Sequence, residues 1–259
     1  MSRESIQDLL NLDGKVALVT GAGRGLGKSM ALALAEAGSD VICVARTKGQ
    51  IEETCAGIEG FGRKGMAIPT DIASSRSVDE MCSAALSEFK KIDILVNNAG
   101  ISIEKPFCDV TDEEWDRLMN INLRGAFFCS RAVGRGMIER RQGKVINISS
   151  ILGKRGYQNF VSYCVSKGAM TQFTRALAME WARYRINVNA IAPGTFLTPF
   201  NEEVYANDKV REVVLKRIPI RRFGQADELG PLVVYMASRA SDYMTGETVY
   251  IDGGQQANL

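Results

Sequence analysis

Histidine is absent from the 259-residue chain, and none of its six cysteines forms a C-x-x-C pair. These absences leave the common zinc ligands missing or scattered, so we expect no metal site. The cysteines are expected to remain reduced thiols, because nothing in their spacing indicates a disulfide framework. Any proton transfer near neutral pH must also use a side chain other than imidazole.

Long apolar runs are absent too. No stretch reaches the roughly 18 apolar residues that a membrane-spanning helix requires, and residues 1–15 lack the apolar segment of a signal peptide. The 32 basic and 30 acidic side chains give a net charge of +2, which creates no strong field for nucleic acid or an anionic membrane. We therefore expect a soluble cytoplasmic protein that binds neither.

Short β-branched runs alternate with longer amphipathic segments along the whole chain. The expected strands are residues 15–20, 40–45, 65–69, 92–97, 143–149, 186–192 and 247–252. The expected helices are residues 26–37, 48–60, 75–90, 112–134, 160–183 and 226–238. Several strand runs are apolar throughout, which is typical of parallel strands covered on both faces. The pattern predicts an α/β fold: a single-domain, Rossmann-like, doubly wound parallel sheet of about seven strands over residues 1–259.

Two features of the chain point to a nucleotide and a substrate site in that fold. The first expected strand runs into "TGAGRGLG" (residues 20–27), in which Gly21, Gly25 and Gly27 open the next helix. Glycines there permit a tight turn and close approach of the backbone to a pyrophosphate. Their G-x-x-x-G-x-G spacing differs from the commoner G-x-G-x-x-G, and a plain strand–helix turn is the alternative. Residues 195–222 interrupt the alternation, so we expect a substrate lid there.

The end of the second expected strand indicates which dinucleotide binds. It reads "VICVART", with Ala45 and Arg46 where an NAD site usually has Asp or Glu. Arg24 lies inside the glycine turn, next to Gly25 and Leu26. Two guanidinium groups and no carboxylate favour a 2′-phosphate, so NADP(H) is expected over NAD(H), which stays possible. The alternative is that one or both arginines point into solvent.

A candidate reacting pair lies in "YCVSK" (residues 163–167). Tyr163 and Lys167 are four residues apart on an expected helix and so share one face. Alone, the pair would be read as an ordinary surface tyrosine and lysine. Ser150 strengthens the functional interpretation, because it follows an expected strand at the sheet edge where parallel sheets bind ligands.

Taken in order, six features resemble the short-chain dehydrogenase/reductase family. They are "TGAGRGLG", "NNAG" (97–100), "NINL" (120–123), Ser150, "YCVSK" and "PGTFLT" (193–198). The resemblance covers about residues 12–254, nearly the whole chain. Each motif is only moderately specific, but all six in sequence leave little room for coincidence.

The resemblance implies a catalytic role for four residues. Tyr163 would give a proton to the carbonyl oxygen or take one from the alcohol, with its pKa lowered by Lys167 and the oxidised nicotinamide. Lys167 would also bond the nicotinamide ribose. Ser150 would stabilise the substrate oxygen, and Asn122 would hold a water in a proton relay to the lysine.

The resemblance also implies further cofactor contacts. Asp71 and Ile72 would lie against the adenine, although Asp71 reads equally well as a cap for helix 75–90. Asn98, Ala99 and Gly100 would line the adenosine ribose side, or be mainly structural. Residues of the nicotinamide pocket would be Pro193, Gly194 and Thr198.

For the substrate, "NLDGKVALVTG", "YRINVNAIAPG" and "KRIPIRRFG" resemble bacterial sugar-acid members of the family, of the gluconate 5-dehydrogenase and 2-deoxygluconate 3-dehydrogenase kind. Those members carry an arginine pair after N-N-A-G, where this chain has Glu104 and Lys105. Lys105, Arg155 or an arginine within 217–222 is then the candidate partner for a substrate carboxylate. A neutral polyol or ketone stays equally open.

Two other functions stay open as alternatives. One is a 3-oxoacyl-[acyl-carrier-protein] reductase, and the other is a non-catalytic, cofactor-binding regulatory protein. Partners other than a small-molecule alcohol or ketone are limited to copies of the chain itself. The family implies a homotetramer built on helices 112–134 and 160–183 and the C-terminal segment.

Overall fold

The computed structural model describes residues 4–199 and 201–257. Its centre is one sheet of seven parallel strands in the order β3-β2-β1-β4-β5-β6-β7. The strands are β1 (Val16–Thr20), β2 (Asp40–Ala45), β3 (Gly65–Pro69), β4 (Ile94–Asn97), β5 (Gly143–Ile148), β6 (Ile186–Pro193) and β7 (Thr248–Ile251). The strand order reverses between β1 and β4, which is where doubly wound sheets bind ligands. The predicted single-domain α/β fold is confirmed.

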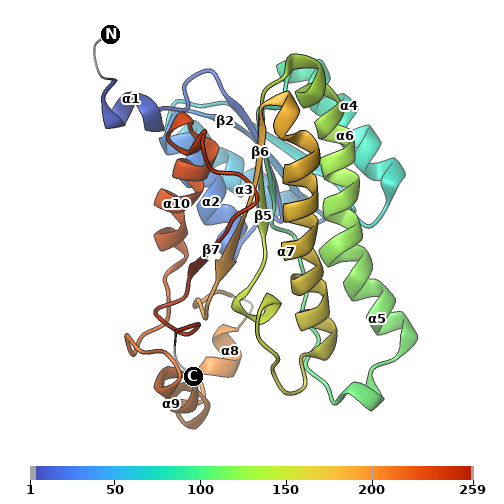
Figure 1. The fold of residues 1–259 in the computed structure, drawn as a ribbon, viewed down its shortest axis with the longest axis vertical. Helices are drawn as coiled ribbons and strands as arrows, with labels where there is room; N and C mark the ends of the chain where they lie inside the picture. The colour runs from blue at the N-terminus through green and yellow to red at the C-terminus, as the bar shows by residue number, and fades with distance from the viewer. Residues whose placement is uncertain (1–3, 200, 258–259) are drawn as a thin grey trace.

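Helices cover both faces of the sheet (Figure 1). On one face lie α2 (Gly25–Glu36), α3 (Lys48–Glu59) and α10 (Gly230–Ala237), and on the other lie α4 (Ser75–Phe89), α6 (Gly125–Arg140) and α7 (Val161–Trp181). Each face has its own apolar core. Because both faces are covered, β1 and β4 are buried along their whole length and show no alternation.

The remaining helices lie outside these two layers: α1 (Ile6–Leu10), α5 (Asp112–Met119), α8 (Glu202–Tyr205) and α9 (Asp208–Lys216). Between α5 and α6 the chain forms a π turn over Asn120–Arg124. The expected single helix 112–134 is therefore two helices with a wider turn between them, and it runs six residues longer. Such turns often occur at functional sites because they redirect side chains.

Helix α4 begins through local hydrogen bonding. Ser74 is its N-cap, and the Ser74 hydroxyl accepts from the Ser77 N–H at 3.3 Å. Asp71 closes its own turn instead, because its carboxylate accepts from the Ala73 N–H at 3.0 Å. The alternative interpretation of Asp71 as the helix cap is therefore wrong.

The segment 195–222 lies beyond the ends of the strands, where α8 and α9 close the lower end of the molecule (Figure 1). Neither short helix was expected from the sequence. Within the described ranges, no helix is long and apolar enough to cross a membrane. Nor do the described cysteine, aspartate and glutamate side chains form a group of three that could hold a metal ion.

Candidate active site

A cavity of about 1200 Å³ opens at the carboxyl ends of the strands. Every residue expected above to contact the cofactor lines it, together with Ser150. Asn122 is the exception among the predicted site residues. The fold therefore brings together side chains that are spread over nearly 180 positions of the chain, from Gly21 to Thr198.

The glycine turn is built for close contact with its surroundings. Gly21 adopts a φ of +67°, which glycine tolerates best, and its N–H donates to the Val44 carbonyl at 2.7 Å. A Cβ on Gly27 would lie 2.2 Å from the Gly21 carbonyl oxygen. The N-cap of α2, Arg24, makes no side-chain capping bond. The first N–H groups of α2, a helix of 12 residues that begins at the cavity, therefore have no bond from the Arg24 side chain. Free N–H groups at a helix N-terminus are a favourable site for an anion.

Around the expected adenosine end, two cations and one carboxylate lie at the cavity wall. Arg24 and Arg46 are both exposed and line it, as the sequence predicts. Asp71 is exposed there too, whereas Ile72 is buried against Gly125. The geometry therefore leaves the two guanidinium groups in position to meet a phosphate at the rim.

The "NNAG" segment fastens β4 to β1. The Asn98 side-chain N–H donates to the Thr20 carbonyl at 2.8 Å, and the Thr20 hydroxyl accepts from the N–H groups of Asn98 and Ala99 at 3.0 and 3.1 Å. These bonds hold the backbone that lines the cavity. The structural interpretation of Asn98 is therefore supported, alongside its place in the cavity wall.

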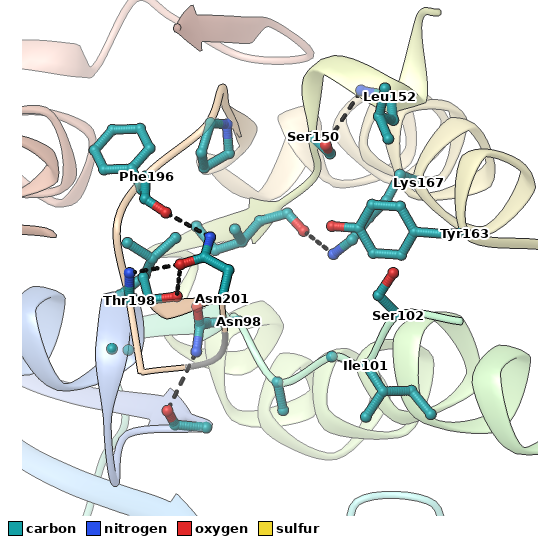
Figure 2. Close-up of a pocket in the computed structure, with 18 of the residues that line it drawn as sticks. Asn98, Ile101, Ser102, Ser150, Leu152, Tyr163, Lys167, Phe196, Thr198 and Asn201 are labelled. Carbon is teal, nitrogen blue, oxygen red and sulfur yellow. Dashed lines mark hydrogen bonds between the residues drawn. The ribbon is translucent and has the colours of Figure 1, made fainter. Parts of the chain in front are cut away.

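Helix α7 brings Tyr163 and Lys167 to the cavity on one face (Figure 2). The Lys167 ammonium lies 5.6 Å from the centre of the Tyr163 ring and donates to the Ile148 carbonyl at 2.7 Å. Ser150 follows β5, and its hydroxyl accepts from the Leu152 N–H at 3.1 Å. Phenol, ammonium and hydroxyl thus converge at the carboxyl end of β5.

Burial dominates the electrostatics of this group. Desolvation raises the pKa of Tyr163 to about 12, although the hydrogen bond with Ser150 acts in the opposite direction. Desolvation also lowers the pKa of Lys167 to about 8. In the protein without its cofactor, loss of water therefore dominates the pKa of the phenol. The expected lowering by Lys167 together with the oxidised nicotinamide stays a prediction.

The buried Lys167 charge is expected to reduce stability at neutral pH. Its pKa is about 8 in the fold and near 10.4 in an unfolded chain, so the unfolded state holds the extra proton between these values. Stability should therefore rise with pH across that window. At about 1.4 kcal/mol per pKa unit, Lys167→Met is expected to raise the free energy of unfolding by about 3 kcal/mol at pH 7.

Urea unfolding at pH 7 and pH 9.5 measures this effect. The gain from Lys167→Met should shrink at the higher pH, since the wild-type lysine is then largely neutral. Lys48→Met, on an exposed helix surface, is the control and should change little. Equal stabilities of wild type and Lys167→Met at pH 7 would contradict the expected cost of burial.

Asn122 lies in the π turn, is buried and is not among the residues that line the cavity. Its amide accepts from the Ile101 N–H at 2.7 Å and donates to the Ile101 carbonyl at 2.8 Å. A Cβ on Gly100 would lie 3.2 Å from the Asn122 oxygen and 3.6 Å from the Lys167 nitrogen. Asn122 therefore positions the segment that follows "NNAG", with only a side-chain-free glycine between it and Lys167.

The first part of the lid segment, around Thr198, lies next to the glycine turn. The Thr198 N–H donates to the Asn201 side chain at 2.9 Å, and the Asn201 amide donates to the Phe196 carbonyl at 2.8 Å (Figure 2). A Cβ on Gly25 would lie 3.6 Å from Thr198. These bonds of Asn201 close a turn over residues 198–201. Asn201 was not identified from the sequence, and the one sequence signal for this turn is an asparagine three residues after Thr198.

Lys105 was the wrong candidate for a substrate carboxylate. Its ammonium pairs with Glu114 at 2.8 Å and does not line the cavity. Arg222 pairs with Glu228 at 2.7 Å, and Arg221 donates to the Lys216 carbonyl at 2.7 Å. Lys105, Arg221 and Arg222, three of the candidate partners for a substrate carboxylate, are therefore bonded to other groups of the protein.

Arg155 and Arg217 do line the cavity, near its outer end. The Arg217 guanidinium donates to the Tyr157 hydroxyl and lies 5.4 Å from the centre of that ring. Tyr157, Ser102 and Tyr205 also line the cavity. They lie in the three segments where the sequence predicts the substrate pocket, namely 150–157, the residues after "NNAG" and 195–222, although no motif marks them individually. The cavity therefore has a catalytic centre at α7 and a polar end at the lid.

Comparison with known proteins identifies the family to which the chain belongs. A family model described as enoyl-(acyl carrier protein) reductase matches residues 21–256. The 2-dehydro-3-deoxy-D-gluconate 5-dehydrogenase of Dickeya dadantii is 40% identical over 250 residues, covering 96% of this chain and 98% of the relative. The chain belongs to the short-chain dehydrogenase/reductase family.

Other members of this short-chain family are similarly close. The 3-oxoacyl-[acyl-carrier-protein] reductase of Vibrio cholerae is 38% identical over 95% of this chain and 98% of the relative. The gluconate 5-dehydrogenase of Burkholderia cenocepacia, solved with NADP and tartrate, has a TM-score of 0.94 and is 35% identical over 98% of this chain and 100% of that one. Relatives with two substrate classes thus share this fold.

Proposed function

We propose that the protein is an NADP(H)-dependent dehydrogenase that acts on a secondary alcohol of a small sugar acid or polyol, or on the matching ketone. One observation carries the proposal: Tyr163, Lys167 and Ser150 converge in the cavity that the glycine turn also lines. The gluconate 5-dehydrogenase of Burkholderia cenocepacia, solved with NADP and tartrate, supports the cofactor and the substrate class.

The cavity offers donors along its whole length for the dinucleotide. Gly21, Gly25, Leu26, Gly27 and the start of α2 would hold the pyrophosphate, and Arg24 and Arg46 the 2′-phosphate. The adenine would lie at Asp71 and Ile72, and its ribose at Asn98, Ala99 and Gly100. The nicotinamide would lie at Pro193, Gly194 and Thr198, with Lys167 on its ribose. When bound, the cofactor supplies or accepts the hydride; NAD(H) stays possible.

The protein itself handles the proton and the charge on the substrate oxygen. On reduction, the Tyr163 hydroxyl gives its proton to the carbonyl oxygen; on oxidation, the phenolate takes a proton from the alcohol. The positive charges of Lys167 and of an oxidised nicotinamide would oppose the burial that raises the Tyr163 pKa to about 12. Ser150 would donate a hydrogen bond to the same oxygen, and Asn122 would hold the water of the relay near Lys167.

Arg217 is the group best placed for a substrate carboxylate. It sits at the end of the lid helix α9, lines the cavity and is held by Tyr157. A lost charge-assisted hydrogen bond is worth about 1.5–3 kcal/mol. Arg217→Leu is therefore expected to raise KM for a sugar acid about 10-fold or more, with little change for a neutral polyol.

Initial rates at 340 nm with D-gluconate and with sorbitol would test this assignment. Arg221→Leu removes the same charge from a residue whose guanidinium bonds the Lys216 carbonyl instead of lining the cavity, and should leave both KM values unchanged. An equal rise of KM for acid and polyol in Arg217→Leu would assign Arg217 to the lid's structure instead.

A 3-oxoacyl-[acyl-carrier-protein] reductase is the second candidate, favoured by the similar Vibrio cholerae enzyme. A non-catalytic regulatory protein is less well supported, because Tyr163 and Lys167 are intact. The distinguishing experiment is a panel of sugar acids, polyols and simple secondary alcohols with NADP⁺ and NAD⁺, followed at 340 nm. Turnover of an acid or polyol with NADP⁺ supports the proposal, and silence across the panel contradicts it.

We also propose a cytoplasmic homotetramer built on α5, α6, α7 and the C-terminal segment. Large apolar side chains on these helices are exposed in the single chain: Phe127 at 42%, Val165 at 45% and Met179 at 83%. A contiguous apolar patch formed by such side chains would indicate a surface that pairs with another chain. In the tetramer, a second copy of the chain would bury these three side chains.

A further inference from the structure

The hydroxyl of Ser102 stands out among the groups of the cavity. Its oxygen is shielded from water, and no hydrogen-bond partner for it exists among residues 4–199 and 201–257. Ser102 lines the cavity, and Figure 2 shows its hydroxyl pointing toward Tyr163. Buried hydroxyls in folded proteins are nearly always bonded, because an unpaired one costs free energy. Its partner is therefore expected among the molecules that bind there.

The backbone around Ser102 is held firmly in place. Its neighbour Ile101 is bonded by Asn122 through both its N–H and its carbonyl, at 2.7 and 2.8 Å. Gly100 lies against Lys167, since a Cβ there would be 3.6 Å from the ammonium nitrogen. The backbone beside Ser102 is thus fixed, and Gly100, two residues before Ser102, lies next to the Lys167 ammonium.

Ser102 also belongs to a short row of cavity-lining residues. Gly100, Ile101, Ser102 and Glu104 line the cavity, whereas Ile103 does not. At the far end, burial first and then the charges of Tyr157 and Glu104 raise the pKa of Tyr205, which comes from the lid helix α8. The row therefore leads from the catalytic centre outward to the lid, along the path that the rest of a substrate would take.

We propose that Ser102 binds the substrate hydroxyl on the carbon next to the one that reacts, so that a neighbouring hydroxyl is required for efficient turnover. This inference rests on the proposed function. Tyr163 and Ser150 would hold the reacting oxygen, and the next carbon would lie toward Ser102, whose hydroxyl points toward Tyr163 (Figure 2). A serine hydroxyl both donates and accepts, which matches an alcohol. A 3-hydroxyacyl chain has no hydroxyl on either carbon next to its carbinol and would leave Ser102 unpaired.

A pair of acids that differ by one hydroxyl tests the proposal. The probes are 3-hydroxybutyrate and 2,3-dihydroxybutyrate, the latter in both diastereomers. Sites built to bond a hydroxyl strongly reject analogues that lack it. The wild type is therefore expected to prefer the dihydroxy acid by about 10- to 100-fold in kcat/KM. Ser102→Ala should remove most of that preference and leave 3-hydroxybutyrate within about twofold.

Ser102→Thr keeps the hydroxyl and should keep the preference. An equal loss of kcat for both acids in Ser102→Ala would overturn the proposal, because it would place Ser102 at the reacting oxygen or a water. Weaker binding of NADPH by Ser102→Ala, with an unchanged preference for the dihydroxy acid, would also overturn the proposal. The partner of the Ser102 hydroxyl would then be the cofactor.

Calorimetric binding of each acid to the enzyme–NADPH complex separates this proposal from the proposed function. If the wild type oxidises neither acid, the proposed function fails for these substrates, while binding still reports on Ser102. Weaker binding of the dihydroxy acid alone in Ser102→Ala supports the proposal. Equal affinities for the two acids in the wild type, or no binding of either, overturn it.

Discussion

Tyr163→Phe is expected to lower kcat about 10²- to 10⁴-fold, the range that general acid–base catalysis supplies. The substitution removes one oxygen and leaves the ring that packs near Phe160 and Lys167. The chain has no histidine. Among the described residues that line the cavity, Tyr163 is the one that has an acidic hydroxyl beside the Lys167 ammonium. The Kd for NADPH should stay within about twofold, because phenol loss does not touch the phosphate end of the site.

Steady-state rates and NADPH fluorescence titration measure the two quantities. Tyr235→Phe, on α10 and outside the cavity lining, makes the same chemical change as a control and should have no effect. A joint loss of turnover and NADPH binding in Tyr163→Phe would make Tyr163 a structural residue. Retained turnover would assign the proton to another group.

Arg46→Asp is expected to shift the preference for NADP(H) over NAD(H) by about 100-fold. Loss of a guanidinium–phosphate bond costs about 1.5–3 kcal/mol, and the new carboxylate repels the 2′-phosphate while it accepts from a ribose 2′-OH. The change lies at the rim, where Arg46 is exposed and lines the cavity. Folding should therefore be unaffected.

The ratio of kcat/KM for NADP⁺ and NAD⁺ reports this shift. Arg76→Asp makes the same change of charge on an exposed surface of α4 and controls for long-range electrostatics. Arg24→Ala should move the ratio in the same direction by a smaller amount, since it adds no repulsion. An unchanged ratio in Arg46→Asp would mean that Arg46 faces solvent in the bound state.

The sheet and the catalytic pair could be predicted because local patterns determine them. Buried parallel strands require continuous apolar runs, so β1, β2 and β4 stand out in the sequence. Tyr163 and Lys167 are four residues apart, which in a helix means one face. The strand-end motifs then had to meet, because parallel strands deliver their carboxyl ends to one edge.

Other parts of the site depend on contacts between distant residues, which no local pattern shows. The pairing of Lys105 with Glu114 and the hold of Asn122 on Ile101 are of this kind. The raised pKa of Tyr163 reflects burial by the whole fold. Helices α8 and α9 are short and polar, and the π turn adds one residue to a helix that otherwise reads as continuous. Shape and burial decided these features.

The most direct test of the proposed activity compares two oxidations in one preparation. Formation of the reduced cofactor at 340 nm, NADPH from NADP⁺ or NADH from NAD⁺, would be followed with D-gluconate and with a 3-hydroxybutyryl thioester. We predict a higher kcat/KM for gluconate, with NADP⁺ as the better cofactor. Turnover of the thioester alone, or of neither compound, would contradict the account.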